Sequence, residues 1–136
     1  VLRIAEEHIR QAGLTGRITT RAGDLRKDDY GTGFDLVFIS AICHMLSPEE
    51  NFEMFRKSLA AVVPGGRVAV SDFILDEDKT SPRFAAVFAL NMLVGTPAGS
   101  CYSVAEYSGW LERAGFTAPR HVSLSGPAGL IIGLRP

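Results

Sequence analysis

The chain has 136 residues, enough for one domain or for part of a larger one. Apolar residues make up 46% and charged residues 21%, a composition that excludes intrinsic disorder. Lys and Arg total 14 and Asp and Glu total 15, so the formal net charge is -1 and gives no reason to expect nucleic acid or an anionic membrane as a partner. Two cysteines without a CxxC spacing argue against a disulfide framework and a zinc site, and favour a reducing, cytoplasmic setting.

The first third of the chain predicts a helix and two strands. Apolar residues recur at helical spacing from Leu2 to Ala12, and Gly13 ends this helix. β-branched residues predict a short strand at 17–22. The nearly continuous apolar run at 34–40 predicts a strand buried on both faces, as in the middle of a parallel sheet.

A second helix is predicted by its starting signals. Ser47 can cap it, Pro48 suits the first helical position, and Glu50 can complete a capping box. The Pro-Gly-Gly triplet at 64–66 ends the helix. The apolar stretch at 68–75 then predicts the next buried strand.

The C-terminal part predicts two helices and a hairpin. The segment 84–94 is apolar all round, so this helix is either deeply buried or faces a cavity or partner, and it is too short to cross a bilayer. A capping box at 103–106 begins another helix, which Gly115 ends. Strands at 121–124 and 130–134 form an antiparallel hairpin. The alternation of helices and strands predicts an α/β fold with a mainly parallel sheet.

Candidate functional residues lie where predicted strands end, because ligands of open parallel sheets bind beyond the carboxyl ends of the strands. His44 follows one strand and is either a general base or an ordinary loop histidine. Asp72 lies at the end of the next, where it either faces a pocket and orients His44 or caps a loop. Asp24 is either a ligand carboxylate or a turn residue. No glycine-rich phosphate loop follows a strand.

Other reactive or apolar side chains give weaker signals. Phe84, Phe88 and Met92 share one helical face, which suits a core as well as a substrate pocket. Cys43 and Cys101 have no base at a suitable spacing, so neither is predicted to be a nucleophile.

Several short motifs, in this order and spacing, resemble the C-terminal part of a class I S-adenosylmethionine-dependent methyltransferase. The resemblance is strongest to small-molecule O-methyltransferases of the plant caffeate O-methyltransferase type and their bacterial relatives in pigment and polyketide pathways. It implies a Rossmann-like sheet whose N-terminal strands are missing here. The motifs are Gly-Asp-Leu at 23–25, Phe-Asp-Leu-Val at 34–37 running to His44, Pro-Gly-Gly-Arg-Val at 64–68, Ala-Glu-Tyr at 105–107 and Ala-Gly-Phe at 114–116.

The resemblance implies S-adenosyl-L-methionine as cofactor and assigns residues to it. Asp24 and Leu25 occupy positions that contact the adenine ring in the family. Ser40 and Ala41 occupy the strand end that approaches the methionine portion. No metal is implied.

The resemblance also implies catalytic and acceptor residues. His44 matches the general base that deprotonates the acceptor hydroxyl for in-line methyl transfer, and Asp72 stands where the plant enzymes carry a glutamate beside that base. Phe88, Met92 and Thr96 match the wall of the acceptor pocket. The acceptor is expected to be a small hydroxylated molecule of the aromatic, polyketide or pigment type.

Some positions depart from the plant pattern. Ser40 and Ala41 replace a lysine and a tryptophan, and Met45 and Leu46 replace the Asp-Trp that follows the base. Cys101 stands near the place of a second flanking glutamate. These differences argue against a phenylpropanoid acceptor.

The family's first two strands, with a glycine-rich loop and a ribose-binding acid, have no counterpart in this sequence, nor has its N-terminal dimerisation domain. Residues 1–136 are therefore expected to be the C-terminal portion of a catalytic domain, inactive alone, from a homodimeric parent. The strand at 34–40 is expected to lack a ladder partner along one edge. The alternatives are a Rossmann-like nucleotide-binding module, such as part of a nicotinamide dehydrogenase, or a catalytically inactive fragment.

Overall fold

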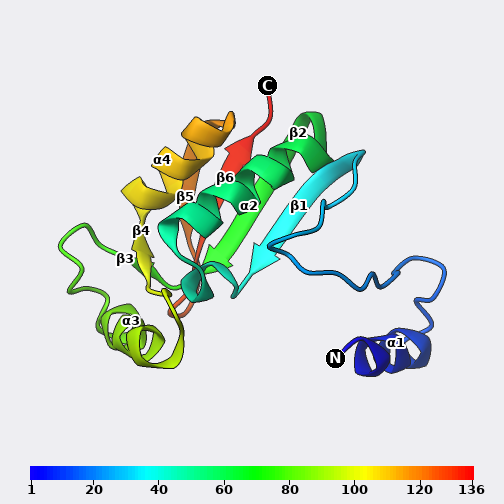
Figure 1. Ribbon diagram of the computed structural model, residues 1–136, viewed down its shortest axis with the longest axis horizontal. Helices are drawn as coiled ribbons and strands as arrows, with labels where there is room; N and C mark the ends of the chain where they lie inside the picture. Colours follow the sequence, from blue (N-terminus) through cyan, green and yellow to red (C-terminus); the bar gives the residue numbers. More distant parts are fainter.

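The computed structural model describes all 136 residues and contains a four-stranded sheet in the order β1-β2-β6-β5 (Figure 1). Strands β1 (Phe34–Ser40) and β2 (Val62–Asp72) run parallel. Strand β6 (Gly129–Leu134) is antiparallel to β2 and to β5 (Thr117–Ser123). The α/β class and the antiparallel C-terminal hairpin are confirmed.

Helices α2 (Pro48–Ala61) and α4 (Val104–Ala114) cover one face of this sheet (Figure 1). Both begin with the predicted capping boxes: Ser47 and Ser103 each accept a hydrogen bond from the backbone three residues on. Gly115 ends α4 with a φ of +108°, in the left-handed region. The main core lies between the helices and the sheet and includes Phe55, Val68, Val70, Tyr107, Leu111, Phe116 and Ile131.

The opposite face of β1 is uncovered. Leu36 is 54% exposed and Phe38 58% exposed, and β1 pairs with β2 along one edge only. Helix α1 (Leu2–Gln11) lies apart from the sheet and has no buried residue (Figure 1). The open edge of β1 agrees with the expected missing ladder partner.

The prediction of a strand at 17–22 is wrong, because this segment forms no helix or strand. Its β-branched residues favour an extended chain, but a strand forms only when a neighbouring strand accepts its hydrogen bonds. Here Thr20 Oγ1 donates to Glu6 Oε1 of α1 at 2.7 Å.

The strand predicted at 68–75 has different bounds. β2 begins at Val62, so the Pro-Gly-Gly triplet at 64–66 lies within it, and Gly65 supplies a φ of +80°. β2 ends at Asp72, and β3 (Ile74–Leu75) pairs instead with β4 (Tyr102–Ser103) in a separate two-stranded sheet. The chain therefore changes sheets immediately after Asp72.

The apolar helix predicted at 84–94 is α3 (Arg83–Gly95), and Ala85 is its only buried residue. Within these 136 residues the helix is not deeply buried, and it presents apolar side chains outward at Phe84, Val87, Leu90, Leu93 and Val94. None of the helices combines the length and the hydropathy that crossing a bilayer requires.

Candidate functional site

His44 lies in a short 3-10 turn, η1 (Cys43–Met45), directly beyond the carboxyl end of β1. Asp72 is the last residue of the neighbouring strand β2. Because β1 and β2 are parallel, both residues reach the same end of the sheet. The structure thus brings together the two side chains that the sequence predicted to form a pair.

The Asp72 carboxylate holds His44 through two hydrogen bonds. Its Oδ1 lies 2.7 Å from His44 Nδ1, and its Oδ2 accepts the His44 backbone N–H at 3.2 Å. Oδ1 also accepts the Phe73 backbone N–H at 2.8 Å. An ionised carboxylate only accepts, so in the neutral imidazole the proton resides on Nδ1 and Nε2 has a free lone pair. The arrangement therefore leaves Nε2 able to take a proton.

Aromatic rings enclose this imidazole. Phe88 of α3 meets the His44 ring edge-on with centroids 5.0 Å apart, and Phe73 stacks against it at 6.2 Å. His44 is 8% exposed and Asp72 3% exposed. Partial exclusion of water strengthens the electrostatic interaction between the two side chains.

Gly99 packs directly on the backbone of the turn that carries His44. A Cβ at this position would overlap the His44 carbonyl oxygen and the Thr96 hydroxyl. Thr96 Oγ1 in turn accepts the Gly99 N–H at 2.7 Å and donates to the Met92 carbonyl at 2.8 Å. The loop after α3 therefore packs against the backbone of His44.

The two cysteines are inert neighbours of this pair. Burial, and then the Asp72 charge, raise the pKa of Cys101 to about 12. The same two causes raise the pKa of Cys43 well above its ordinary value. Both remain neutral thiols near neutral pH, in line with the prediction that neither is a nucleophile.

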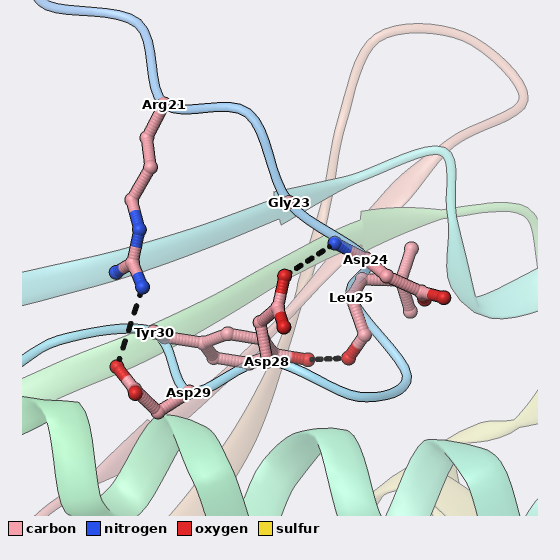
Figure 2. A pocket seen from close by; sticks show the side chains of 7 residues that line it. All are labelled: Arg21, Gly23, Asp24, Leu25, Asp28, Asp29 and Tyr30. Carbon is pink, nitrogen blue, oxygen red and sulfur yellow. Dashed lines mark hydrogen bonds and ion pairs between the residues drawn. The ribbon is translucent and has the colours of Figure 1, made fainter.

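The predicted adenine-side residues lie in a second place, a cavity of about 270 Å³ beside the loop at 21–30. Figure 2 shows the Asp28 carboxylate turned toward the backbone of Asp24, whose N–H it accepts at 2.7 Å. Tyr30 Oη donates to the Leu25 carbonyl at 2.9 Å. Two of the predicted cofactor residues, Asp24 and Leu25, line this cavity.

The structure shows Asp24 in the first of the two roles that the sequence left open, that of a turn residue. Its Oδ1 accepts the Arg26 backbone N–H at 2.9 Å, as in a turn, and this bond holds the pKa of Asp24 below its usual range. Its Oδ2 has only Lys27 nearby, at 3.6 Å. One oxygen of an ionised carboxylate therefore remains available to accept a hydrogen bond from a ligand amine.

Ser40 and Ala41 lie at the exposed end of β1. Ala41 has a φ of +54°, in the left-handed region, and its N–H donates to the Ser71 carbonyl at 2.9 Å. This sharp turn directs the chain from β1 into the turn that carries His44.

The residues predicted to bind the acceptor are only partly brought together. Phe88 contacts the His44 ring, whereas Met92 and Thr96 lie further along α3 and at its C-terminal cap. Thr96 lines a separate cavity of about 350 Å³ with Leu90, Leu93 and neighbouring loop residues. No group of three or more His, Cys, Asp or Glu side chains is arranged to hold a metal ion.

Sequence reasoning missed Asp28, Lys57 and Gly99. Asp28 lies in a charged stretch that predicted a loop or a ragged helix, and Gly99 in a Gly- and Pro-containing loop. Their partners are distant in the chain or are backbone atoms, so no residue pattern signals them. Phe73 lies in the stretch 71–73 that the rule on strand ends selects.

A family model described as an O-methyltransferase domain matches residues 1–117. The chain is 39% identical to a 3-hydroxy-5-methyl-1-naphthoate 3-O-methyltransferase of Streptomyces sahachiroi, over 99% of this chain and 39% of that protein. It is 35% identical to an L-tyrosine C(3)-methyltransferase of Streptomyces lavendulae, over 83% of this chain and 31% of that protein.

Solved structures give the same picture. A crystal structure described as that of an O-methyltransferase from Nostoc punctiforme has a TM-score of 0.94 and 34% identity, covering 99% of this chain and 42% of that one. The structure of PigF with SAH has a TM-score of 0.87 and 33% identity, covering 96% of this chain and 39% of that one. The chain spans about two-fifths of the length of these relatives. The predicted family resemblance is confirmed, and it argues against the dehydrogenase alternative.

Proposed function

Because this chain belongs to the O-methyltransferase domain family, we propose that it is the C-terminal portion of an S-adenosyl-L-methionine-dependent O-methyltransferase domain. The acceptor is a small hydroxylated aromatic molecule. Two observations support the assignment to part of a domain: the chain covers about two-fifths of its relatives, and β1 has an open edge and an uncovered apolar face.

The hydrogen-bonded pair of His44 and Asp72 carries this proposal. His44 Nε2 takes the proton of the acceptor hydroxyl, which turns the oxygen into a better nucleophile. Asp72 holds the ring through Nδ1 at 2.7 Å and stabilises the imidazolium that forms. The imidazolium then passes the proton to water.

S-adenosyl-L-methionine, when bound, supplies the electrophilic methyl group. The residues present suit its adenine end: Asp24 Oδ2 would accept a hydrogen bond from the adenine amine, and Leu25 would contact the ring. Ser40 and Ala41, at the carboxyl end of β1, would face the methionine portion. The loop lies near the end of the sheet that carries His44, since Arg26 is ion-paired with Glu50 in the first turn of α2, and α2 begins shortly after the turn that contains His44.

An aromatic acceptor suits the surroundings of His44. Phe73, Phe84 and Phe88 form a cluster with centroid distances of 4.7 to 6.2 Å. Planar rings pack favourably against such edges and faces. We assign Phe88, Met92 and Thr96 to the acceptor side. The exposed apolar side chains of α3 would be covered by contacts between the two subunits of a homodimeric parent.

The test is methyl transfer by the full-length protein that contains this chain, supplied with labelled S-adenosyl-L-methionine and a panel of phenols. Wild-type protein is expected to methylate at least one phenol. His44→Ala should lower kcat by about 10²–10⁴-fold and leave the cofactor Kd nearly unchanged. His8→Ala, which changes an exposed histidine of α1, is the matched control.

Mass spectrometry of the product distinguishes oxygen from carbon as the methylated atom. A carbon-methylated product would overturn the assignment of the acceptor atom. A His44→Ala rate within about two-fold of wild type would overturn the base assignment.

A further inference from the structure

The loop at 24–28 has backbone carbonyls that no backbone N–H satisfies. Lys27 and Asp28 donate their N–H groups back to the Asp24 carbonyl at 3.0 and 2.8 Å, which closes a single helical turn. The carbonyl oxygens of Leu25, Arg26 and Asp28 accept no backbone hydrogen bond. Acceptors left at the end of such a turn are satisfied by a side chain or by water, and only a side chain fixes the shape of the turn.

Lys57, in the third turn of α2, provides that side chain. Its Nζ lies 3.2 Å from the Leu25 carbonyl oxygen, 2.7 Å from that of Arg26 and 3.0 Å from that of Asp28. An ammonium group has three N–H donors and no acceptor, so three carbonyls match it completely. Hydrogen bonds with a charged donor are also stronger than neutral ones.

Two neighbouring contacts reinforce this arrangement. Lys57 Nζ lies 5.6 Å from the centre of the Tyr30 ring, a cation–π contact, and the Tyr30 hydroxyl donates to the same Leu25 carbonyl. Arg26 Nε pairs with Glu50 Oε1 at 2.6 Å, about two helical turns nearer the start of α2 than Lys57. The loop is thus fastened to α2 rather than to the sheet.

We infer that Lys57 is a positioning residue for cofactor binding, which holds the 24–28 turn so that Asp24 and Leu25 are preset for the adenine end. This inference rests on the proposed function. Leu25 alone of this turn packs against the core, and the other four residues are exposed, so without Lys57 the turn would populate other conformations. Cofactor binding would then have to order it, and the apparent affinity would fall.

The test uses the full-length protein and three variants: Lys57→Met, Lys57→Arg and the control Arg56→Met. Arg56 is the adjacent exposed cation of α2 and pairs only with Glu53 within the helix. We expect Lys57→Met to raise the Kd of S-adenosyl-L-methionine about tenfold by isothermal titration, with kcat at saturating cofactor and the acceptor KM within about two-fold of wild type. Arg56→Met should leave the cofactor Kd, kcat and the acceptor KM unchanged. Lys57→Arg should keep most of the wild-type affinity for the cofactor.

A second readout needs no cofactor. Hydrogen–deuterium exchange of the cofactor-free protein should be faster at 24–30 in Lys57→Met than in wild type, and unchanged in α4. If Lys57→Met does not fold, Tyr30→Phe replaces it, with an expected rise of about three-fold in the cofactor Kd. Wild-type protein that does not bind S-adenosyl-L-methionine would contradict the proposed function. Wild-type binding with an unchanged Kd in the folded variants would overturn the inference about Lys57 alone.

Discussion

The two parts of the candidate site are held in opposite ways. His44 and Asp72 are buried. Burial also raises the pKa values of the two neighbouring thiols, Cys43 and Cys101. The loop at 21–30 is exposed, and backbone N–H groups lower the pKa values of its carboxyls Asp24 and Asp29. One part depends on packing and the other on a few polar contacts.

This difference suits the two roles that we propose. Proton transfer by His44 and Asp72 would need a fixed geometry and partial exclusion of water, which burial supplies. A loop that admits a large cofactor would be better drawn from the less stable part of a structure, held by a small number of contacts such as those of Lys57. Each region should therefore fail under different conditions.

The largest expected effect is a loss of folding stability at alkaline pH, which should come from the buried core and not from the loop at 21–30. Burial raises the pKa of Cys101 from an ordinary value of 9.0, and that of Tyr102 from 10.0, to about 12. Burial likewise raises the pKa values of Cys43 and Tyr107. As the pH rises, the unfolded chain loses these protons before the folded chain does. The contribution of these groups to the free energy of unfolding is therefore complete below about pH 9 and is lost as the pH rises toward 12.

Urea unfolding of the full-length protein at pH 8, 10 and 11 measures this effect. The free energy of unfolding should fall steadily across the series, and less steeply in Cys101→Ala, which removes one of the titrating groups. A free energy that stays level from pH 8 to pH 11 would contradict the expectation.

The two faces of the sheet offer the next comparison. Phe55→Ala removes a fully buried ring between α2 and the sheet and should cost about 3–5 kcal/mol of unfolding free energy. Leu36→Ser, on the uncovered face of β1, should cost far less in the 136-residue chain and should increase its monomeric fraction in size-exclusion chromatography. Equal losses at both positions would mean that the face of β1 is covered in solution.

Gly99→Ala is expected to disturb the hydrogen-bonded pair of His44 and Asp72, although Gly99 is not part of it. The added methyl group meets the His44 carbonyl and should cost about 1–3 kcal/mol while lowering kcat more than it changes the cofactor Kd. Gly95→Ala, at a glycine with open space around it, should leave both stability and kcat unchanged or slightly improved. Similar kinetics in the two variants would show that the loop after α3 does not position His44.

The sequence predicted the elements whose signals are local. Capping boxes at Ser47 and Ser103 and the left-handed stop at Gly115 were predicted correctly because each signal lies within a few residues. The strand at 17–22 was predicted wrongly because strand formation depends on a paired neighbour, and no strand pairs with this segment.

The candidate site was predictable to a similar extent. The rule on strand ends selected His44 and Asp72, which the structure brings to 2.7 Å. It could not select Lys57, whose role depends on carbonyl oxygens 29 to 32 positions away in the chain. Contacts between a side chain and distant backbone atoms leave no residue pattern.

The smallest expected effect is confined to the loop at 21–30 and occurs in acid. Arg26 N–H donates to Asp24 Oδ1 at 2.9 Å, and Gly31 N–H donates to Asp29 Oδ1 at 2.8 Å. These bonds stabilise the ionised carboxylates and lower their pKa values. The stabilisation that they give to the loop is therefore complete above the ordinary pKa of 3.8 and is lost as the pH falls below it. The amide proton shifts of Arg26 and Gly31, followed by NMR on the full-length protein, should therefore titrate with midpoints below 3.8. Asp24→Asn should abolish the titration at Arg26 and preserve that at Gly31, because each amide reports its own carboxylate. A midpoint above 3.8 at Arg26, or one that survives Asp24→Asn, would mean that the turn in solution differs from the one that presents Asp24 to the cavity.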